Sequence, residues 1–437
     1  MQVNVLNWKS SPNGPLRGTL RVPGDKSVSH RAMMLAGLAD GSSRIEGFLE
    51  GEDTLSTAAV MQALGVRIEA DQPGVRIVHG VGLHGLKGVG QPLDCGNAGT
   101  GMRLLTGLLA GQAFDSTLVG DESLSRRPMG RVTEPLSAMG ASFSTEDGRP
   151  PVRIHGGKAL HGISYTLPVA SAQVKSALLL AGLYAEGETE VIEPHPTRDY
   201  TERMLAAFGW PIRFEPGRAR LSGGHRLQAT DVVVPADFSS AAFFLVAASI
   251  VPGSELVLAR VGLNPRRTGL LQALRLMGAD IRVENEGVSG GEAIADLRVR
   301  HARLKGVELP PSLVPDMIDE FPALFVAAAV AEGRTVVTGA AELRVKESDR
   351  LAAMARGLQG LGVVVEESPD GAVIHGGRIG GGQVESLGDH RIAMSFAVAG
   401  LVAEGPIRIG DCANVATSFP GFVELANDCG FSVADAD

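Results

Sequence analysis

The chain alternates apolar, helix-like runs with short stretches in which apolar and polar residues alternate, and a glycine stands at each change. Such apolar runs predict helices, and the alternating stretches predict strands. A glycine at the junction is typical of a helix C-terminus, where the backbone needs a positive φ. In a first series, exemplified by ALGVRIE and LMGADIRVE, the glycines are Gly65, Gly140, Gly209, Gly278, Gly362 and Gly430.

A second series of glycines is interleaved with the first, and each of them closes an apolar run ahead of alternating residues. Its members are Gly41, Gly111, Gly187, Gly253, Gly333 and Gly405. Strict alternation of the two series indicates an internal repeat whose units each contain two helices and several strands. Subtracting the positions of the first series gives spacings of 75, 69, 69, 84 and 68 residues. These units are longer than solenoid repeats, which run roughly 20–50 residues.

Length and composition predict two domains of three repeat units each. A chain of 437 residues exceeds what one hydrophobic core usually supports. Hydrophobic residues make up 44% of the chain and aromatic residues only 4%, so we expect helices rich in Ala, Val and Leu that pack closely. The apolar runs 241–251 and 325–331 are shorter than the roughly 20 residues that span a membrane, and they predict buried helices.

Charge and cysteine usage exclude several classes of partner. The net charge of −9 argues against nucleic acid as a partner. Residues 1–14 have no apolar core behind a basic start, so we expect no export signal and no membrane association. Cys95, Cys412 and Cys429 have no metal-ligand spacing. They predict a cytoplasmic protein without a metal site, with all three thiols in the core.

Cations stand at the predicted starts of several repeat helices. Pro128, Pro322 and Pro420 fit first helical positions and support these starts. Ordinary capping explains the Ser, Thr, Asp and Asn residues found there, but cations oppose the helix dipole. An anion in front of the helices would remove this conflict. The cations are Lys26, Arg127, Arg198, Lys346 and Arg391, and they predict a cleft that binds a highly anionic small molecule.

Two carboxylates among these basic motifs suggest proton transfer. Glu347 and Arg350 are three residues apart and Lys346 and Arg350 four apart, which predicts one shared helix face. A solvated ion-pair face is the alternative for this motif. Asp316 follows a breaker-rich stretch and is predicted on a loop before an apolar helix, where a capping role is the alternative.

The motifs together resemble the 5-enolpyruvylshikimate-3-phosphate synthase family, in the family's order along nearly the whole chain. The segments that carry the resemblance are PGDKSVSHR (23–31), GNAGTGMR (96–103), RRPMGR (126–131), ASAQVKSALLLAG (170–182), PTRDYTE (196–202), PDMIDE (315–320), RVKESDRL (344–351) and GDHRIAMS (388–395). ASAQVKSA and TRD are similar to the second sub-class of the family. Glu342, Ala172 in place of a second serine, and Thr417 in place of a lysine are departures from the better-known pattern.

The resemblance implies an α/β fold, a two-domain inside-out α/β barrel of six βαβαββ-type repeats, three per domain. It implies a discontinuous carboxy-terminal-type domain, 1–22 plus 239–437, and an amino-terminal-type domain, 23–238. The chain would cross between them near 21–23 and 235–239.

The resemblance also implies the reaction, transfer of the enolpyruvyl group of phosphoenolpyruvate to the 5-hydroxyl of shikimate 3-phosphate, in a monomer without cofactor that glyphosate inhibits. The residues implied to contact shikimate 3-phosphate are Lys26, Ser27, Arg31, Ser171, Ala172, Gln173, Arg198, Asp316 and Lys346. Those implied to contact phosphoenolpyruvate are Lys26, Asn97, Gly99, Thr100, Arg127, Gln173, Arg350 and Arg391. Those implied to carry proton transfer are Lys26, Asp316 and Glu347.

Two alternatives remain. An enolpyruvyl transferase acting on UDP-N-acetylglucosamine would share the fold and chemistry, but it usually has a reactive cysteine on a mobile loop, and residues 112–127 contain none. A non-enzymatic repeat scaffold would predict varied polar residues at the helix starts rather than a cationic cluster with paired acids.

Overall fold

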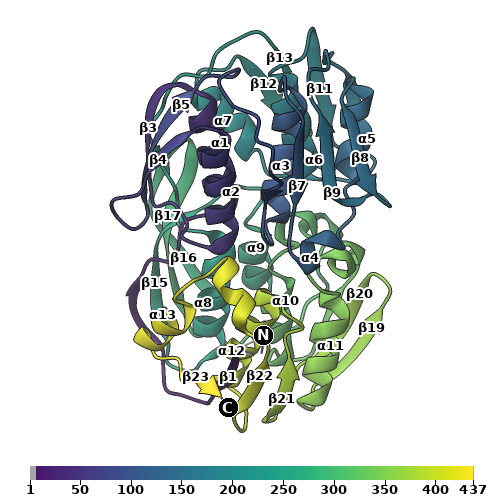
Figure 1. Ribbon diagram of the computed structural model, residues 1–437. Helices are drawn as coiled ribbons and strands as arrows, with labels where there is room; N and C mark the ends of the chain where they lie inside the picture. Colours follow the sequence, from purple (N-terminus) through teal and green to yellow (C-terminus); the bar gives the residue numbers. More distant parts are fainter. Residues whose placement is uncertain (1–5, 437) are drawn as a thin grey trace. The chain divides into compact units, whose positions relative to one another are not determined.

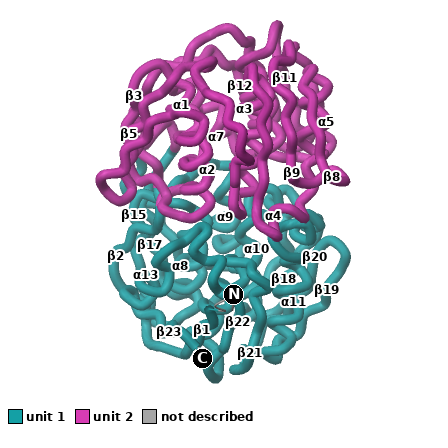
Figure 2. The backbone as a smooth tube through the Cα atoms, in the orientation of Figure 1, with its two compact units in different colours: residues 1–23, 236–287, 293–437 teal, residues 24–235, 288–292 magenta. Residues whose placement is uncertain are grey.

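The computed structural model describes residues 6–436, and its chain forms two compact units (Figure 2). Unit 1 comprises residues 1–23, 236–287 and 293–437, and unit 2 comprises residues 24–235 and 288–292. The chain therefore enters unit 2 after Pro23 and leaves it after Pro235. It also contributes residues 288–292 to unit 2, which the sequence did not predict. Residues 1–5 of the predicted segment 1–22, and residue 437, lie outside the described residues.

Unit 2 contains three four-stranded sheets within its described residues, each with one parallel and two antiparallel strand pairs. In sheet order the strands are β14 (Val232–Val233), β3 (Asp40–Glu46), β5 (Val75–Val81), β4 (Arg67–Glu69); β6 (Leu93–Asp94), β7 (Ser116–Val119), β9 (Arg149–His155), β8 (Ser142–Glu146); and β10 (Ser164–Thr166), β11 (Glu188–Ile192), β13 (Arg218–Ser222), β12 (Ile212–Glu215). The helices are α1 (Lys26–Leu38), α2 (Glu52–Ala63), α3 (Gly99–Ala110), α4 (Glu122–Ser125), α5 (Gly130–Ala138), α6 (Ala172–Gly182) and α7 (Tyr200–Ala207).

Small residues let the buried helices of unit 2 approach one another closely. Helices α1, α3 and α6 are buried along almost their whole length. A Cβ atom at Gly107 of α3 would lie 2.1 Å from the carbonyl oxygen of Ala177 on α6. The low aromatic content of the chain fits this packing, because bulky rings would hold the helices apart.

Within its described residues, unit 1 contains three further sheets; their strands are labelled in Figure 1. In sheet order the strands are β16 (Asp280–Ser289), β17 (Glu292–Arg300), β15 (Glu255–Gly262), β2 (Arg17–Leu20); β18 (Arg334–Val337), β20 (Gly371–His375), β19 (Val364–Ser368); and β21 (Gly382–Glu385), β22 (Ile407–Gly410), β1 (Asn7–Ser10), β23 (Val433–Ala436). The helices are α8 (Phe238–Ile250), α9 (Gly269–Leu276), α10 (Phe321–Ala329), α11 (Arg350–Gly360), α12 (His390–Gly400) and α13 (Phe422–Asp428). Short 3₁₀ turns are η1 (Pro311–Leu313), η2 (Pro315–Met317), η3 (Ala341–Val345) and η4 (Ala413–Thr417).

The apolar runs of the sequence form the core of unit 1. Run 241–251 lies in α8 and its C-cap, and run 325–331 covers the end of α10 and the turn that follows; every residue of both helices is buried. The prediction of buried helices is therefore confirmed. No helix within residues 6–436 combines the length and the apolar character that a membrane span requires. The three cysteines are buried and unpaired, as predicted, and burial raises the pKa of each thiol to about 12.

Most of the repeat glycines have the predicted backbone conformation. All except Gly111 and Gly405 have φ between 76° and 112°. At Gly111 the predicted positive φ is wrong, since φ is −87°. The glycine is needed there for space instead, because a Cβ would lie 2.3 Å from the ring of Tyr184. Of the prolines predicted at first helical positions, Pro322 is the second residue of α10, whereas Pro128 and Pro420 precede α5 and α13.

Candidate functional site

The starts of the buried helices of unit 2 carry most of the predicted ligand contacts. Lys26 is the first residue of α1, whose N-cap Asp25 accepts a hydrogen bond from the Val28 amide at 2.9 Å. Its ammonium forms an ion pair with Asp53, the second residue of α2, and the Asp53 side chain is only 5% exposed. Sequence reasoning missed Asp53 as a site residue, and Asp53 holds the Lys26 side chain at this position.

A second group gathers at the start of α3. Arg127 Nη2 donates to Asn97 Oδ1 at 2.8 Å and to Ser123 Oγ at 3.3 Å. Asn97 in turn donates to Asp121 Oδ2 at 2.7 Å. A Cβ at Gly99 would lie 2.7 Å from Arg127 Nη1. The structure therefore brings Asn97, Gly99 and Arg127 into one cluster, with the guanidinium beside the first turn of the helix.

Helices α3 and α6 are joined by a side chain that the sequence assigned to both ligands. Gln173 Nε2 donates to Thr100 Oγ1 at 2.8 Å, and Gln173 Oε1 accepts from Arg103 Nη1 at 2.7 Å. Sequence reasoning missed Arg103, although it lies four residues after Gly99 and so on the same face of the helix. Two residues before Gln173, Ser171 caps α6 by accepting a hydrogen bond from the Val174 amide at 3.4 Å. Ala172, the first residue of α6, is buried.

Arg31 is a buried cation held by three hydrogen bonds. Its guanidinium donates to the Ser27 carbonyl at 2.8 Å, to Ser176 Oγ at 2.8 Å and to Thr201 Oγ1 at 2.7 Å. Burial, and then repulsion from Arg198, lower the pKa of Arg31 to about 10. The two arginines thus act on each other electrostatically, and the attraction of a bound anion would offset the effects of burial and of repulsion.

The predicted site residues of unit 1 gather around buried carboxylates. Arg350, the first residue of α11, donates to Asp389 Oδ2 at 2.8 Å and to Glu347 Oε2 at 2.6 Å. Burial would lower the pKa of Arg350, but the attraction of Asp389 and Glu347 outweighs it, and the pKa is raised. Burial would likewise raise the pKa of Asp389, yet Arg350 holds it below its usual value.

Asp319 holds the remaining cations of this group. Its carboxylate lies 3.6 Å from Lys346 Nζ and 3.5 Å from Arg350 Nη1. Its backbone carbonyl accepts from Arg391 Nη1 at 3.2 Å. Arg267 binds the same carboxylate at 2.8 Å. Sequence reasoning missed Asp319 and Asp389 as site residues, because nothing local reveals cations that reach them from 27 to 72 positions away in the chain.

Asp316 is paired with a further arginine. It lies in the 3₁₀ turn η2, is 7% exposed, and its Oδ2 is 3.3 Å from Arg266 Nη1. Asp316 was predicted on a loop before the apolar helix α10, and it lies there in a short 3₁₀ turn. Arg266 was also missed; its only signal in the sequence is the Arg-Arg pair in NPRRTG, directly before α9.

One predicted geometry is wrong. Lys346 and Glu347 do not share a helix face with Arg350, because α11 begins only at Arg350 and residues 346–349 lead into it. Asp349 explains this start, since it caps α11 by accepting from the Ala352 amide at 3.0 Å. The Glu347–Arg350 contact forms nevertheless, through the turn rather than through a helix.

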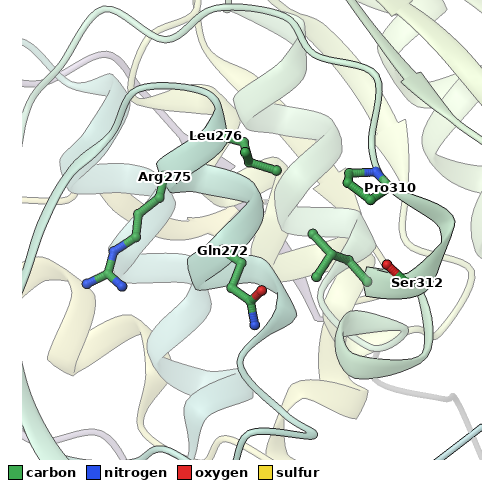
Figure 3. Close-up of a pocket in the computed structure, with 6 residues that line it drawn as sticks. Gln272, Arg275, Leu276, Pro310 and Ser312 are labelled. Atoms are coloured by element: carbon green, nitrogen blue, oxygen red, sulfur yellow. The ribbon is translucent and has the colours of Figure 1, made fainter.

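The two clusters have different electrostatic characters. In unit 2 burial and repulsion from Arg198 lower the pKa of Arg31, so an anion bound beside Arg31 would be favoured. In unit 1 a carboxylate lies within 4 Å of each of five cations and holds it in place; the cations are Arg266, Arg267, Lys346, Arg350 and Arg391. A hollow of about 470 Å³ on α9 and η1, lined by Gln272, Arg275, Leu276, Pro310, Ser312 and Leu313, contains none of the predicted site residues (Figure 3).

Cationic clusters at the starts of buried helices, in an α/β chain, are typical of proteins that bind small anions. The family model for EPSP synthase (3-phosphoshikimate 1-carboxyvinyltransferase) matches residues 11–425. The chain belongs to this family of transferases, as the sequence motifs indicated.

Relatives match over the full length of the chain. Proteins named 3-phosphoshikimate 1-carboxyvinyltransferase from Xanthomonas euvesicatoria pv. vesicatoria (strain 85-10) and Xanthomonas campestris pv. campestris (strain B100) are 68% and 67% identical to it, covering 100% and 99% of this chain and 99% of each relative. The solved structure of EPSP synthase from Acinetobacter baumannii superposes with a TM-score of 0.90 at 52% identity, covering 99% of this chain and 100% of that one. The mixed α/β architecture is therefore that of an EPSP synthase.

Proposed function

We propose that this protein transfers the enolpyruvyl group of phosphoenolpyruvate to the 5-hydroxyl of shikimate 3-phosphate and releases inorganic phosphate. The observation that carries the proposal is the full-length match to a family named for this transfer. The reaction belongs to the shikimate pathway, which leads through chorismate to the aromatic amino acids. Both substrates are phosphorylated anions, which suits the cationic clusters described above.

The chemistry requires three proton transfers at the reacting carbon atoms and the 5-hydroxyl. A proton is added to the methylene carbon of phosphoenolpyruvate while the 5-hydroxyl oxygen, losing its proton, bonds to the neighbouring carbon. The resulting tetrahedral adduct then loses a proton and inorganic phosphate, which restores the double bond. We assign these proton transfers to Lys26, Asp316 and Glu347, as the resemblance implies. Groups in this role must lie within hydrogen-bond reach of the reacting atoms.

The cations are assigned to the two ligands as the resemblance implies. Arg31 and Arg198, with Ser27, Ser171, Ala172, Gln173 and Lys346, bind shikimate 3-phosphate. Arg127, Arg350 and Arg391, with Asn97, Gly99 and Thr100, bind phosphoenolpyruvate and stabilise the departing phosphate. The fixed hydrogen bonds of Arg31, Arg127 and Gln173 support these assignments, because preorganised donors need little rearrangement when an anion binds.

The finer description of the fold is also a proposal. Six βαβαββ-type units, three in each domain of an inside-out barrel, would account for the six sheets that residues 6–436 form. Five sheets have a parallel edge pair, and the three-stranded sheet has an isolated parallel bridge, Glu308 with Val336, at the corresponding edge. The motifs ASAQVKSA and TRD, with Arg198 and Glu342, support membership of the second sub-class. We further propose a cytoplasmic monomer, and the three unpaired cysteines support a reducing compartment.

Release of inorganic phosphate from phosphoenolpyruvate tests this function. Purified protein should release phosphate only when shikimate 3-phosphate is present. Release that depends on UDP-N-acetylglucosamine would favour the alternative transferase, and no release with either acceptor would favour the repeat scaffold.

A further inference from the structure

Lys175 is a buried cation that none of the assigned roles uses. It is the fourth residue of α6 and only 2% exposed, although a cation near a helix N-terminus opposes the helix dipole. Its ammonium lies 2.8 Å from Glu193 Oε2 and 2.8 Å from Glu202 Oε1, and both carboxylates are buried. Burial would lower the pKa of Lys175, but the attraction of Glu202 and Glu193 exceeds that effect and raises it.

The two carboxylates lie at either end of one short loop. Glu193 directly follows β11, and Glu202 lies in the first turn of α7, which begins at Tyr200. The loop between them, 194–199, contains Arg198. Glu193 also accepts hydrogen bonds from the amide of Thr197 at 3.3 Å and from its hydroxyl, so the residue before Arg198 is fixed as well. One ammonium therefore joins α6 to both ends of the loop.

Residues adjacent to the Lys175 ion pairs also bind Arg31. Thr201, next to Glu202, accepts from Arg31 Nε at 2.7 Å, and Ser176, next to Lys175, accepts from Arg31 Nη2 at 2.8 Å. The Thr201 hydroxyl donates to Ser176 Oγ at 2.7 Å, which links α7 to α6 a second time. The positions of Arg31 and Arg198 thus depend on how α6 and α7 are held together.

We propose that Lys175, with Glu193 and Glu202, is a positioning cluster that fixes the Arg198 loop for binding of shikimate 3-phosphate. The cluster touches no reacting atom, so its effect falls on affinity for this one substrate. A buried ion cluster is a poor source of stability, because well-packed apolar residues often replace one without loss. Positioning of the loop explains why a charge is kept where an apolar side chain would fit the helix.

The first test measures the loop itself and does not depend on the enzymatic activity. In Lys175→Met the side-chain volume is nearly kept, but two buried carboxylates face each other without a cation and repel. Amide hydrogen exchange over residues 194–199 should then be faster than in the wild type. Lys158→Met, which removes an exposed lysine of the same unit, is the matched control and should exchange at the wild-type rate. Unchanged exchange in Lys175→Met would overturn the proposal.

The second test measures the consequence for the substrate, and it rests on the proposed function. Lys175→Met should raise KM for shikimate 3-phosphate by about tenfold or more, the loss expected for one misplaced charge-assisted contact, and should change KM for phosphoenolpyruvate by less than about threefold. A wild type without phosphate release would count against the proposed function and leave the exchange result to decide on the loop. An active wild type with an unchanged KM in the variant would refute the positioning role.

Thr197→Val keeps the proposal testable if Lys175→Met fails to fold, because it leaves the buried charges intact. Removing the hydroxyl that Glu193 accepts should raise KM for shikimate 3-phosphate by about three- to fivefold. In the double variant with Lys175→Met the two effects should not add, since both act through Glu193. An unaltered KM in Thr197→Val, or full additivity in the double variant, would show that Glu193 does not connect Lys175 to the loop.

Discussion

Gly99→Ala should weaken glyphosate more than phosphoenolpyruvate, and the structure identifies the atom that carries the effect. A Cβ at this position would lie 2.7 Å from Arg127 Nη1, whereas ordinary contacts begin near 3.4 Å. The guanidinium must therefore move by 3.4 − 2.7, about 0.7 Å. Arg103 Nη1 and Leu124 Cδ1 would lie 3.5 Å and 3.6 Å from the new methyl, which is ordinary contact, so Arg127 bears the clash.

The variant should fold, because the displaced atom is the far end of a flexible side chain. The shift works against the hydrogen bonds from Arg127 to Asn97 at 2.8 Å and to Ser123 at 3.3 Å. Adding a methyl group to a packed site typically costs about 1–3 kcal/mol. If glyphosate, the longer ligand, bears that cost in full, its inhibition constant rises by roughly five- to hundredfold. Phosphoenolpyruvate leaves more room and should lose no more than about threefold in KM.

The assay is phosphate release at varied phosphoenolpyruvate, with and without glyphosate, in the wild type and in Gly99→Ala. Inhibition should be competitive with phosphoenolpyruvate. Gly90→Ala is the control for an added methyl group, because no atom lies within 4 Å of its Cβ position. A wild type that already resists glyphosate, or equal shifts of both constants in Gly99→Ala, would refute the reasoning.

Three further predictions concern the carboxylates and a buried histidine. Asp316→Asn and Glu347→Gln should each lower kcat by about 10²- to 10⁴-fold while changing KM much less, since shape is kept and proton transfer lost; near-normal turnover in both would show that the proton transfers belong elsewhere. Asp389→Asn should lower the free energy of unfolding by about 3–5 kcal/mol, because Arg350 keeps a buried charge without its main partner; denaturant unfolding measures this, and a loss below about 1 kcal/mol contradicts it. His30 is buried, and burial, with Lys26 and Arg31, holds its pKa well below the usual 6.5. The unfolded chain therefore takes up the proton first as the pH falls, so this contribution to stability is complete above pH 6.5 and declines below it by up to about 1.4 kcal/mol per pH unit. His30→Asn should flatten the decline, and an identical pH dependence in the variant would contradict the assignment.

The sequence by itself determined the features that depend on neighbouring residues. Helix ends followed from glycines such as Gly65 and Gly278, because a positive φ is a property of one residue and its turn. The starts of α1, α3, α6, α10 and α12 followed from polar residues that stand directly before apolar runs. The family followed from the order of the motifs, since each motif is a continuous segment.

Only the tertiary structure decided which charges meet. Asp389 and Arg350 are 39 residues apart, and Lys175 reaches Glu193 and Glu202 from a different helix. The residue spacing also led to the wrong prediction that Lys346 and Glu347 lie on a helix. Asp349 caps α11, so the helix begins only at Arg350. Helical and strand periodicity reflect contacts close in the chain, whereas an ion pair depends on how whole elements pack. The sequence therefore revealed which residue types the site needs, and packing decided which partner holds each of them.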